Sequence, residues 1–159
     1  MFARYFVELP LPLDEAERAL LERPDAWVPR LAGVADERGE ALLAEVGFGV
    51  GLRIGKQVEL DFGAPIRMPS RTILPMRWHA PGGQGRFPAL DADLELAPLG
   101  AAATQLSISA RYEPPMGAVG RAMDRALLHR VAEATVKDFL DRIAEALMAL
   151  VPPGSVRGA

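Results

Sequence analysis

The sequence predicts an α+β fold, in which a curved antiparallel sheet of about six strands wraps around a long C-terminal helix. Two short helices are expected after the first strand. Apolar and polar residues alternate at 2–9 and again between 41 and 113, as they do in strands with one solvated face. After residue 116 the apolar period changes to about 3.6 residues, which is typical of a helix.

The N-terminal elements are a strand and two short helices. The strand is predicted at 2–9 and is followed closely by prolines. A helix is expected over 14–23. Asp14 stands three residues before Glu17, which is the spacing of a capping box, so we expect Asp14 to cap this helix. The second short helix is predicted at 24–33.

Glycine occupies every second position in the stretch GFGVGLRIG at 47–55. A dinucleotide loop needs the pattern GxGxxG between a strand and a helix, whereas another strand follows here. We therefore interpret the stretch as a strand with a bare face that permits a strong bend. Its apolar face consists of Val46, Phe48, Val50 and Leu52. Further strands are predicted by alternation at 57–62, 72–80, 90–97 and 104–112.

The last helix is predicted at 117–150. We expect four residues to face the sheet: Ala132, Val136, Phe139 and Ile143. The first half of this helix is apolar on a second face as well, which needs cover from the short helices or from a partner. A homodimer is therefore one expectation.

Composition excludes several classes of function. The chain has 159 residues, a net charge of −3 and no cluster of basic residues, so we expect no nucleic-acid partner. It contains no cysteine, which makes a cytoplasmic location the simplest interpretation. We expect no transmembrane segment, no metal site and no cofactor. One domain at 1–151 and a flexible tail at 152–159 complete the predicted organisation.

Three segments carry a resemblance to a known superfamily: ILPMRWHA at 73–80, FPALDADLELAPL at 87–99, and the run from Ala110 to Leu147. With the order of elements, they resemble the START-like superfamily, also called SRPBCC, which has the helix-grip fold. This superfamily includes birch-pollen-allergen-like and polyketide-cyclase-like proteins. The resemblance implies a cavity between the sheet and the long helix that holds an apolar molecule such as a lipid, a sterol or a polyketide.

Nine residues are the candidates for the lining of this cavity. Aromatic and methionine side chains suit an apolar pocket, while a tyrosine hydroxyl and an imidazole would supply polar contacts. Each residue also has a simpler interpretation, as core packing or, for His129, as a polar residue at the edge of the core. The candidates are Phe48, Val50, Met76, Trp78, Leu94, Ile108, Tyr112, Met123 and His129.

No catalytic residues can be assigned from the sequence. The chain has no GxSxG motif, and Asp91, Asp93 and Glu95 alternate on what we interpret as a solvated strand face. We therefore interpret the chain as a carrier or sensor of a small apolar molecule rather than an enzyme. The alternatives are a cyclase- or dehydratase-like enzyme that uses the same cavity, and a protein-binding module whose core is filled.

Overall fold

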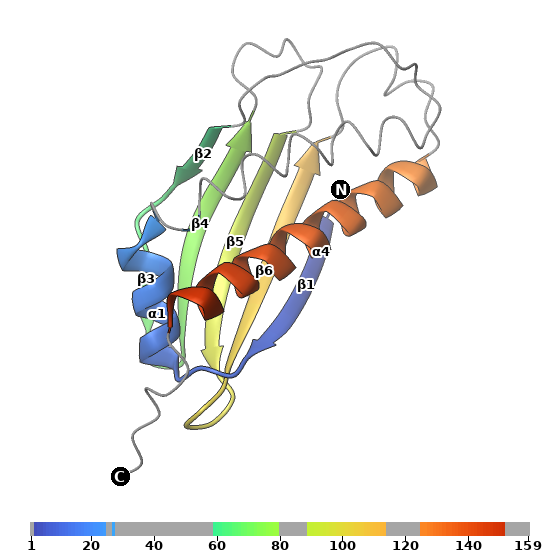
Figure 1. Ribbon diagram of the computed structural model, residues 1–159. Coiled ribbons are helices and arrows are strands. Elements are labelled where there is room, and N and C mark those ends of the chain that lie inside the picture. The colour runs from blue at the N-terminus through green and yellow to red at the C-terminus, as the bar shows by residue number, and fades with distance from the viewer. Residues whose placement is uncertain (1, 25–26, 28–58, 80–88, 114–124, 152–159) are drawn as a thin grey trace.

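The described strands form one antiparallel sheet, and the C-terminal helix lies across one of its faces (Figure 1). The computed structural model describes residues 2–24, 27, 59–79, 89–113 and 125–151. The strands are β1 (Phe2–Leu9), β2 (Glu59–Phe62), β3 (Ile66–Met68), β4 (Arg71–His79), β5 (Ala89–Pro98) and β6 (Thr104–Glu113). The helices are α1 (Leu13–Glu22) and α4 (Arg125–Leu150). The predicted α+β architecture is confirmed.

The sheet has the order β1-β6-β5-β4-β2, and β3 also pairs with β4. Five strands begin and end within two residues of their predicted bounds: β1, β2, β4, β5 and β6. A strand with one buried and one solvated face alternates apolar and polar residues along its length, and this alternation made the five strands predictable. The predicted strand at 47–55 and the predicted tail lie outside the described residues. So do the start of the last helix at 117–124 and most of the second short helix.

Helix α1 begins differently from the prediction. The residue before its first turn is Pro12, which makes no side-chain cap, and the Ala16 amide donates to the Pro12 carbonyl oxygen at 3.0 Å. Asp14 lies inside the first turn, so the prediction that it caps the helix is wrong. Glu17 is also not part of a capping box. Its carboxylate accepts a hydrogen bond from the Thr72 hydroxyl on β4, which ties α1 to the sheet.

Strand β3 was not predicted. It has three residues, of which Ile66 and Met68 are exposed, so it shows no buried alternation. Both β2 and β3 pair with β4, and residues 63–65 connect them. The Gly63 amide donates to the Pro75 carbonyl oxygen at 2.8 Å, and a Cβ at position 63 would lie 3.1 Å from the Cβ of Pro75. Glycine at position 63 therefore permits the backbone after β2 to approach Pro75 on β4 closely.

The core lies between the sheet and the two helices. On α4, Val136, Phe139 and Ile143 are buried as predicted, with exposed fractions of 2%, 5% and 0%. The side chain of Ala132 is not among those described. Trp27 is fully buried beside α1: its Nε1 donates to the Leu20 carbonyl oxygen at 3.1 Å. Its ring meets Phe62 edge-on, with centroids 5.4 Å apart.

Substitution of Phe139 by Asp should destabilise the fold strongly. The change removes a buried ring and buries a charge without a partner, so we expect a loss of at least about 3 kcal/mol in the free energy of unfolding. Met148→Asp is the matched control, because Met148 is on the same helix and 38% exposed. Urea unfolding measures both. Equal stability of the two variants would contradict the packing of α4 described above.

The contact between Thr72 and Glu17 gives a second test. Thr72 is 2% exposed, and Thr72→Val keeps its shape but removes the donor to Glu17. We expect a loss of about 1–2 kcal/mol in urea unfolding, because the carboxylate loses a hydrogen bond inside the protein. Thr72→Ser retains the hydroxyl and should lose less. A serine variant no more stable than the valine variant would show that the hydrogen bond contributes nothing.

Candidate functional site

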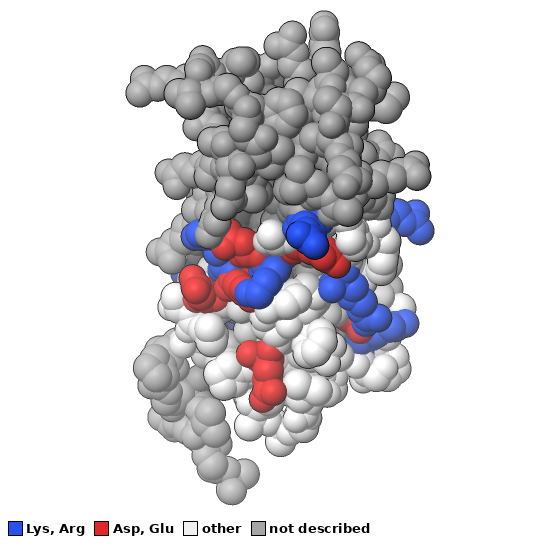
Figure 2. All heavy atoms as spheres, turned by 90° about the vertical axis from the view of Figure 1, so that its right-hand side faces the viewer, with Lys and Arg blue, Asp and Glu red and all other residues white. Residues whose placement is uncertain are grey.

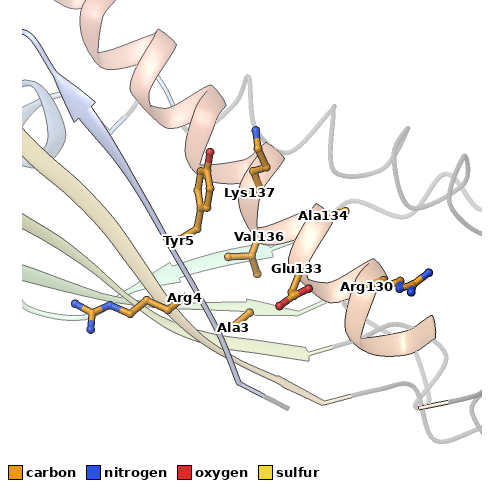
Figure 3. Close-up of a pocket in the computed structure, with 8 residues that line it drawn as sticks. All are labelled: Ala3, Arg4, Tyr5, Arg130, Glu133, Ala134, Val136 and Lys137. Carbon is orange, nitrogen blue, oxygen red and sulfur yellow. The ribbon is translucent and has the colours of Figure 1, made fainter. Parts of the chain in front are cut away.

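A groove lies between β1, the strand at one end of the described sheet, and the first half of α4 (Figure 3). Its volume is about 330 Å³, at the lower end of the range for small-molecule sites, and it is partly open to solvent. Eight residues line it: Ala3, Arg4, Tyr5, Arg130, Glu133, Ala134, Val136 and Lys137.

Strand and helix periodicity give the groove an apolar floor. On β1, alternation directs Ala3 and Tyr5 to the face of the sheet that α4 covers, here called the inner face, and Arg4 to the outer face. Figure 3 shows Arg4 pointing away from α4 and Val136 pointing from α4 toward the sheet. Ala3 is 6% and Val136 2% exposed. The floor is therefore apolar and closely packed.

A row of small side chains starts in this groove. Ala3 is the register partner of Ala110 on β6, and Ala110 is the partner of Ala92 on β5. Three neighbouring strands thus carry alanine at the same level of the inner face. The next row of the inner face, by contrast, carries Tyr5 and Ile108. The inner face of the sheet therefore carries smaller side chains at the level of the alanine row than in the next row.

The polar rim of the groove centres on Lys137. Its Nζ lies 2.6 Å from Oδ2 of Asp141 and 5.2 Å from the centroid of the Tyr5 ring. The hydrogen bond with Asp141, and then the one with Tyr5, raises the pKa of Lys137 above its usual value. The ammonium group therefore stays protonated at neutral pH. It can hold an anion or a carbonyl oxygen, but it is a poor general base.

Glu133 brings a carboxylate to the same groove and connects it to His129. Figure 3 shows Glu133 pointing from α4 toward β1. Its Oε1 lies 3.2 Å from Nε2 of His129, with side chains 58% and 48% exposed respectively. His129 does not line the groove itself. The structure places this predicted residue beside the site, one turn of α4 before Glu133.

Three other candidates lie together in the core. Met76, Leu94 and Ile108 are 4%, 0% and 0% exposed, and Leu94 is the register partner of Ile108. They share the inner face with the alanine row. Their contact with a ligand remains a prediction.

The remaining candidates are described in part or not at all. The backbones at Trp78 and Tyr112 both flank Leu90, so positions 78 and 112 lie in one cross-strand row of the inner face. Phe48, Val50 and Met123 lie outside the described residues.

Sequence reasoning missed the polar residues of the groove. The alternation of β1 indicates that Tyr5 lies on the same face as Ala3. Glu133 and Lys137 look like the solvated face of an amphipathic helix, and both are indeed exposed. Which helical face lies beside β1 depends on where α4 crosses the sheet, and no local pattern in the sequence carries that information.

The acidic array on β5 is part of a solvated face with charge pairs across the strands. Oδ1 of Asp91 accepts a hydrogen bond from Nε of Arg77 at 2.6 Å. Oε2 of Glu95 lies 3.5 Å from a guanidinium nitrogen of Arg71, which makes an ion pair. The hydrogen bond with Asp91 raises the pKa of Arg77 further above its usual range.

Within the described part of the chain, no three His, Asp or Glu side chains are grouped to hold a metal ion. In the same part, no helix has the length and apolar character to cross a membrane.

Comparisons with solved structures support the fold. A conserved protein from Geobacillus kaustophilus superposes with a TM-score of 0.52 at 15% identity, over 94% of this chain and 96% of that one. A hypothetical protein from Helicobacter pylori superposes with a TM-score of 0.53 at 10% identity, over 96% of this chain and 88% of that one. The di-domain ARO/CYC protein BexL, from the BE-7585A biosynthetic pathway, gives 0.51 at 13% identity, over 96% of this chain and 48% of BexL.

These identities are low, so the likeness shows a shared fold. It is consistent, at the level of the fold, with the START-like resemblance of the sequence. No family model matches the chain, and no curated protein matches it in sequence.

Proposed function

We propose that this chain binds a small, mainly apolar molecule with one polar end, as a carrier or sensor. The ligand enters the groove between β1 and α4, and its apolar body lies along the row of alanines on the inner face. Lipids, sterols and polyketide-like molecules have this chemistry. The observation that carries the proposal is the groove itself, in which an apolar floor at Ala3 and Val136 meets the Tyr5–Lys137 pair.

The two parts of the groove have different energetic roles in this proposal. Each methylene group that a ligand buries contributes about 0.8 kcal/mol, so the apolar body supplies most of the affinity. The protonated Lys137 and the Tyr5 hydroxyl hold an oxygen at the polar end and thereby orient the ligand. A lysine ammonium is charged over the neutral pH range, and the raised pKa of Lys137 does not change that.

A cyclase- or dehydratase-like enzyme is the second candidate. The fold likeness to BexL supports it, and so does the pair of Glu133 with His129, a carboxylate and an imidazole at the edge of the groove. A carboxylate and an imidazole are the side chains most often used in general acid–base catalysis. Turnover of a polyketide-like substrate that His129→Ala abolishes, with ligand binding unchanged, would favour the enzyme over the carrier.

Filling the groove should weaken binding of an apolar probe. The fluorescence of 1-anilinonaphthalene-8-sulfonate reports the binding, and Ala3→Leu should raise its dissociation constant at least about tenfold by occupying the apolar floor. Ala97→Leu adds the same volume to the outer face of β5 and should bind like the wild type. Thermal unfolding checks that both variants are folded. Equal binding by both variants would place the probe elsewhere, and no binding by the wild type would favour a module with a filled core.

The head-group specificity tests Lys137. Dodecanoic acid and 1-dodecanol have the same chain length, so they differ only in the polar end. Lys137→Met should weaken the acid about tenfold or more and the alcohol much less, because a charged hydrogen bond is lost only with the acid. Arg142→Met removes a cation elsewhere on α4, where it pairs with Asp138 at 3.1 Å, and serves as the control. Equal weakening of both ligands by Lys137→Met would contradict the assigned role.

A further inference from the structure

Strand β1 lies at the end of the sheet, and among the described residues it is hydrogen-bonded on one side only, to β6. It extends over eight residues. A free strand edge of this length presents unpaired N–H and C=O groups that can pair with another strand. Figure 2 shows the side of the molecule where β1 and the first half of α4 lie. On this side, basic side chains (blue) and acidic side chains (red) lie next to one another.

The outer face of β1 carries an alternating set of exposed groups. Phe2 and Phe6 are 58% and 65% exposed, which is unusual for aromatic rings on a strand. Arg4 and Glu8 alternate with them, are exposed as well, and make no ion pair with any other described residue. One strand thus presents an aromatic, a cation, an aromatic and an anion in sequence order.

We propose that β1 pairs antiparallel with β1 of a second copy of the chain, with a two-fold axis beside Phe6. In this register Phe6 lies opposite Phe6 of the second copy, Arg4 opposite Glu8, and Glu8 opposite Arg4. The outer face then gains one aromatic pair and two ion pairs across the strands. On the inner face, the half-buried Tyr5 lies opposite Val7, so the pairing covers apolar surface there as well.

Other registers are worse. A shift by one residue would set the outer face of one strand against the inner face of the other. A two-residue shift in one direction places Arg4 opposite Phe6, and a four-residue shift places Arg4 opposite Arg4 of the second copy. Among these registers, only the proposed one pairs opposite charges. Because the interface is symmetric, the Arg4–Glu8 ion pair forms twice, once with each copy supplying the arginine.

The pairing is compatible with the groove. Arg4 is one of the residues that line the groove, but its side chain points away from α4, so its pairing with a second copy takes place outside the space between β1 and α4 (Figure 3). The second strand would lie beside β1 and form a further wall at the open side of the groove. Of the outer-face residues of β1, only Arg4 is therefore shared between the groove lining and the proposed pairing.

Sedimentation equilibrium of the full chain with charge-reversal variants tests the proposal. Arg4→Glu sets carboxylates opposite each other and Glu8→Arg sets guanidinium groups opposite each other, so each should raise the dimer dissociation constant at least tenfold. The double variant restores opposite charges and should dimerise like the wild type. Arg67→Glu makes the same charge change on β3, at the other side of the sheet, and should have no effect. A monomeric wild type, or a double variant as weak as the single ones, would overturn the proposal.

Cross-linking tests the register directly. The chain has no cysteine, so Phe6→Cys introduces the single thiol. Opposed residues in antiparallel strands have Cα atoms about 4.5–5.5 Å apart, within the range of a disulfide. Mild oxidation should therefore convert Phe6→Cys to a covalent dimer, whereas Phe2→Cys, which lies opposite Pro10 of the second copy, should stay mostly monomeric on a denaturing gel. Equal cross-linking of the two variants, or none with Phe6→Cys, would overturn the register.

Discussion

The packing of α4 on the inner face of the sheet is the constraint on which the other features depend. The second half of this helix is anchored by apolar side chains, among which Leu140, Ile143 and Leu147 are fully buried. In the first half, His129 and Glu133 are exposed. The groove lies beside β1 at this first half, where Val136 is buried against the sheet and Glu133 and Lys137 are exposed at the rim. It therefore forms where the buried and the exposed side of one helix meet the sheet.

Buried hydrogen bonds reinforce the anchored end of the molecule. Thr104 is fully buried and donates to the Leu11 carbonyl oxygen at 2.8 Å, and Thr72 donates to Glu17. Trp27 donates to a carbonyl of α1 in the same way. Buried polar groups with partners favour one arrangement of the chain, because any other arrangement leaves them unpaired. The end of the sheet near α1 is thus specified by polar contacts, whereas the alanine row further along has none to satisfy.

Local patterns predicted most of the described strands and little of the site. Alternation predicted β1, β4, β5 and β6 because a half-buried strand must show it, and it failed for β3, which is exposed along its whole length. The capping prediction failed because Glu17 finds its partner 55 residues away, which no local spacing reveals. The contact of Lys137 with Tyr5 was unpredictable for the same reason: it joins the two ends of the chain.

Strand alternation also explains how one edge strand can serve both proposed roles. Odd-numbered positions of β1, such as Ala3 and Tyr5, face the groove, and even-numbered ones, such as Arg4 and Phe6, face outward. A change at an odd position alters the volume or polarity available to a ligand but leaves the outer charges in place. A change at Phe6 or Glu8 alters the outer face and leaves the residues that line the groove in place, whereas Arg4 belongs to both sets. Ligand binding and self-association are therefore separable by substitution at every one of these positions except Arg4, although both depend on the backbone of the same eight residues.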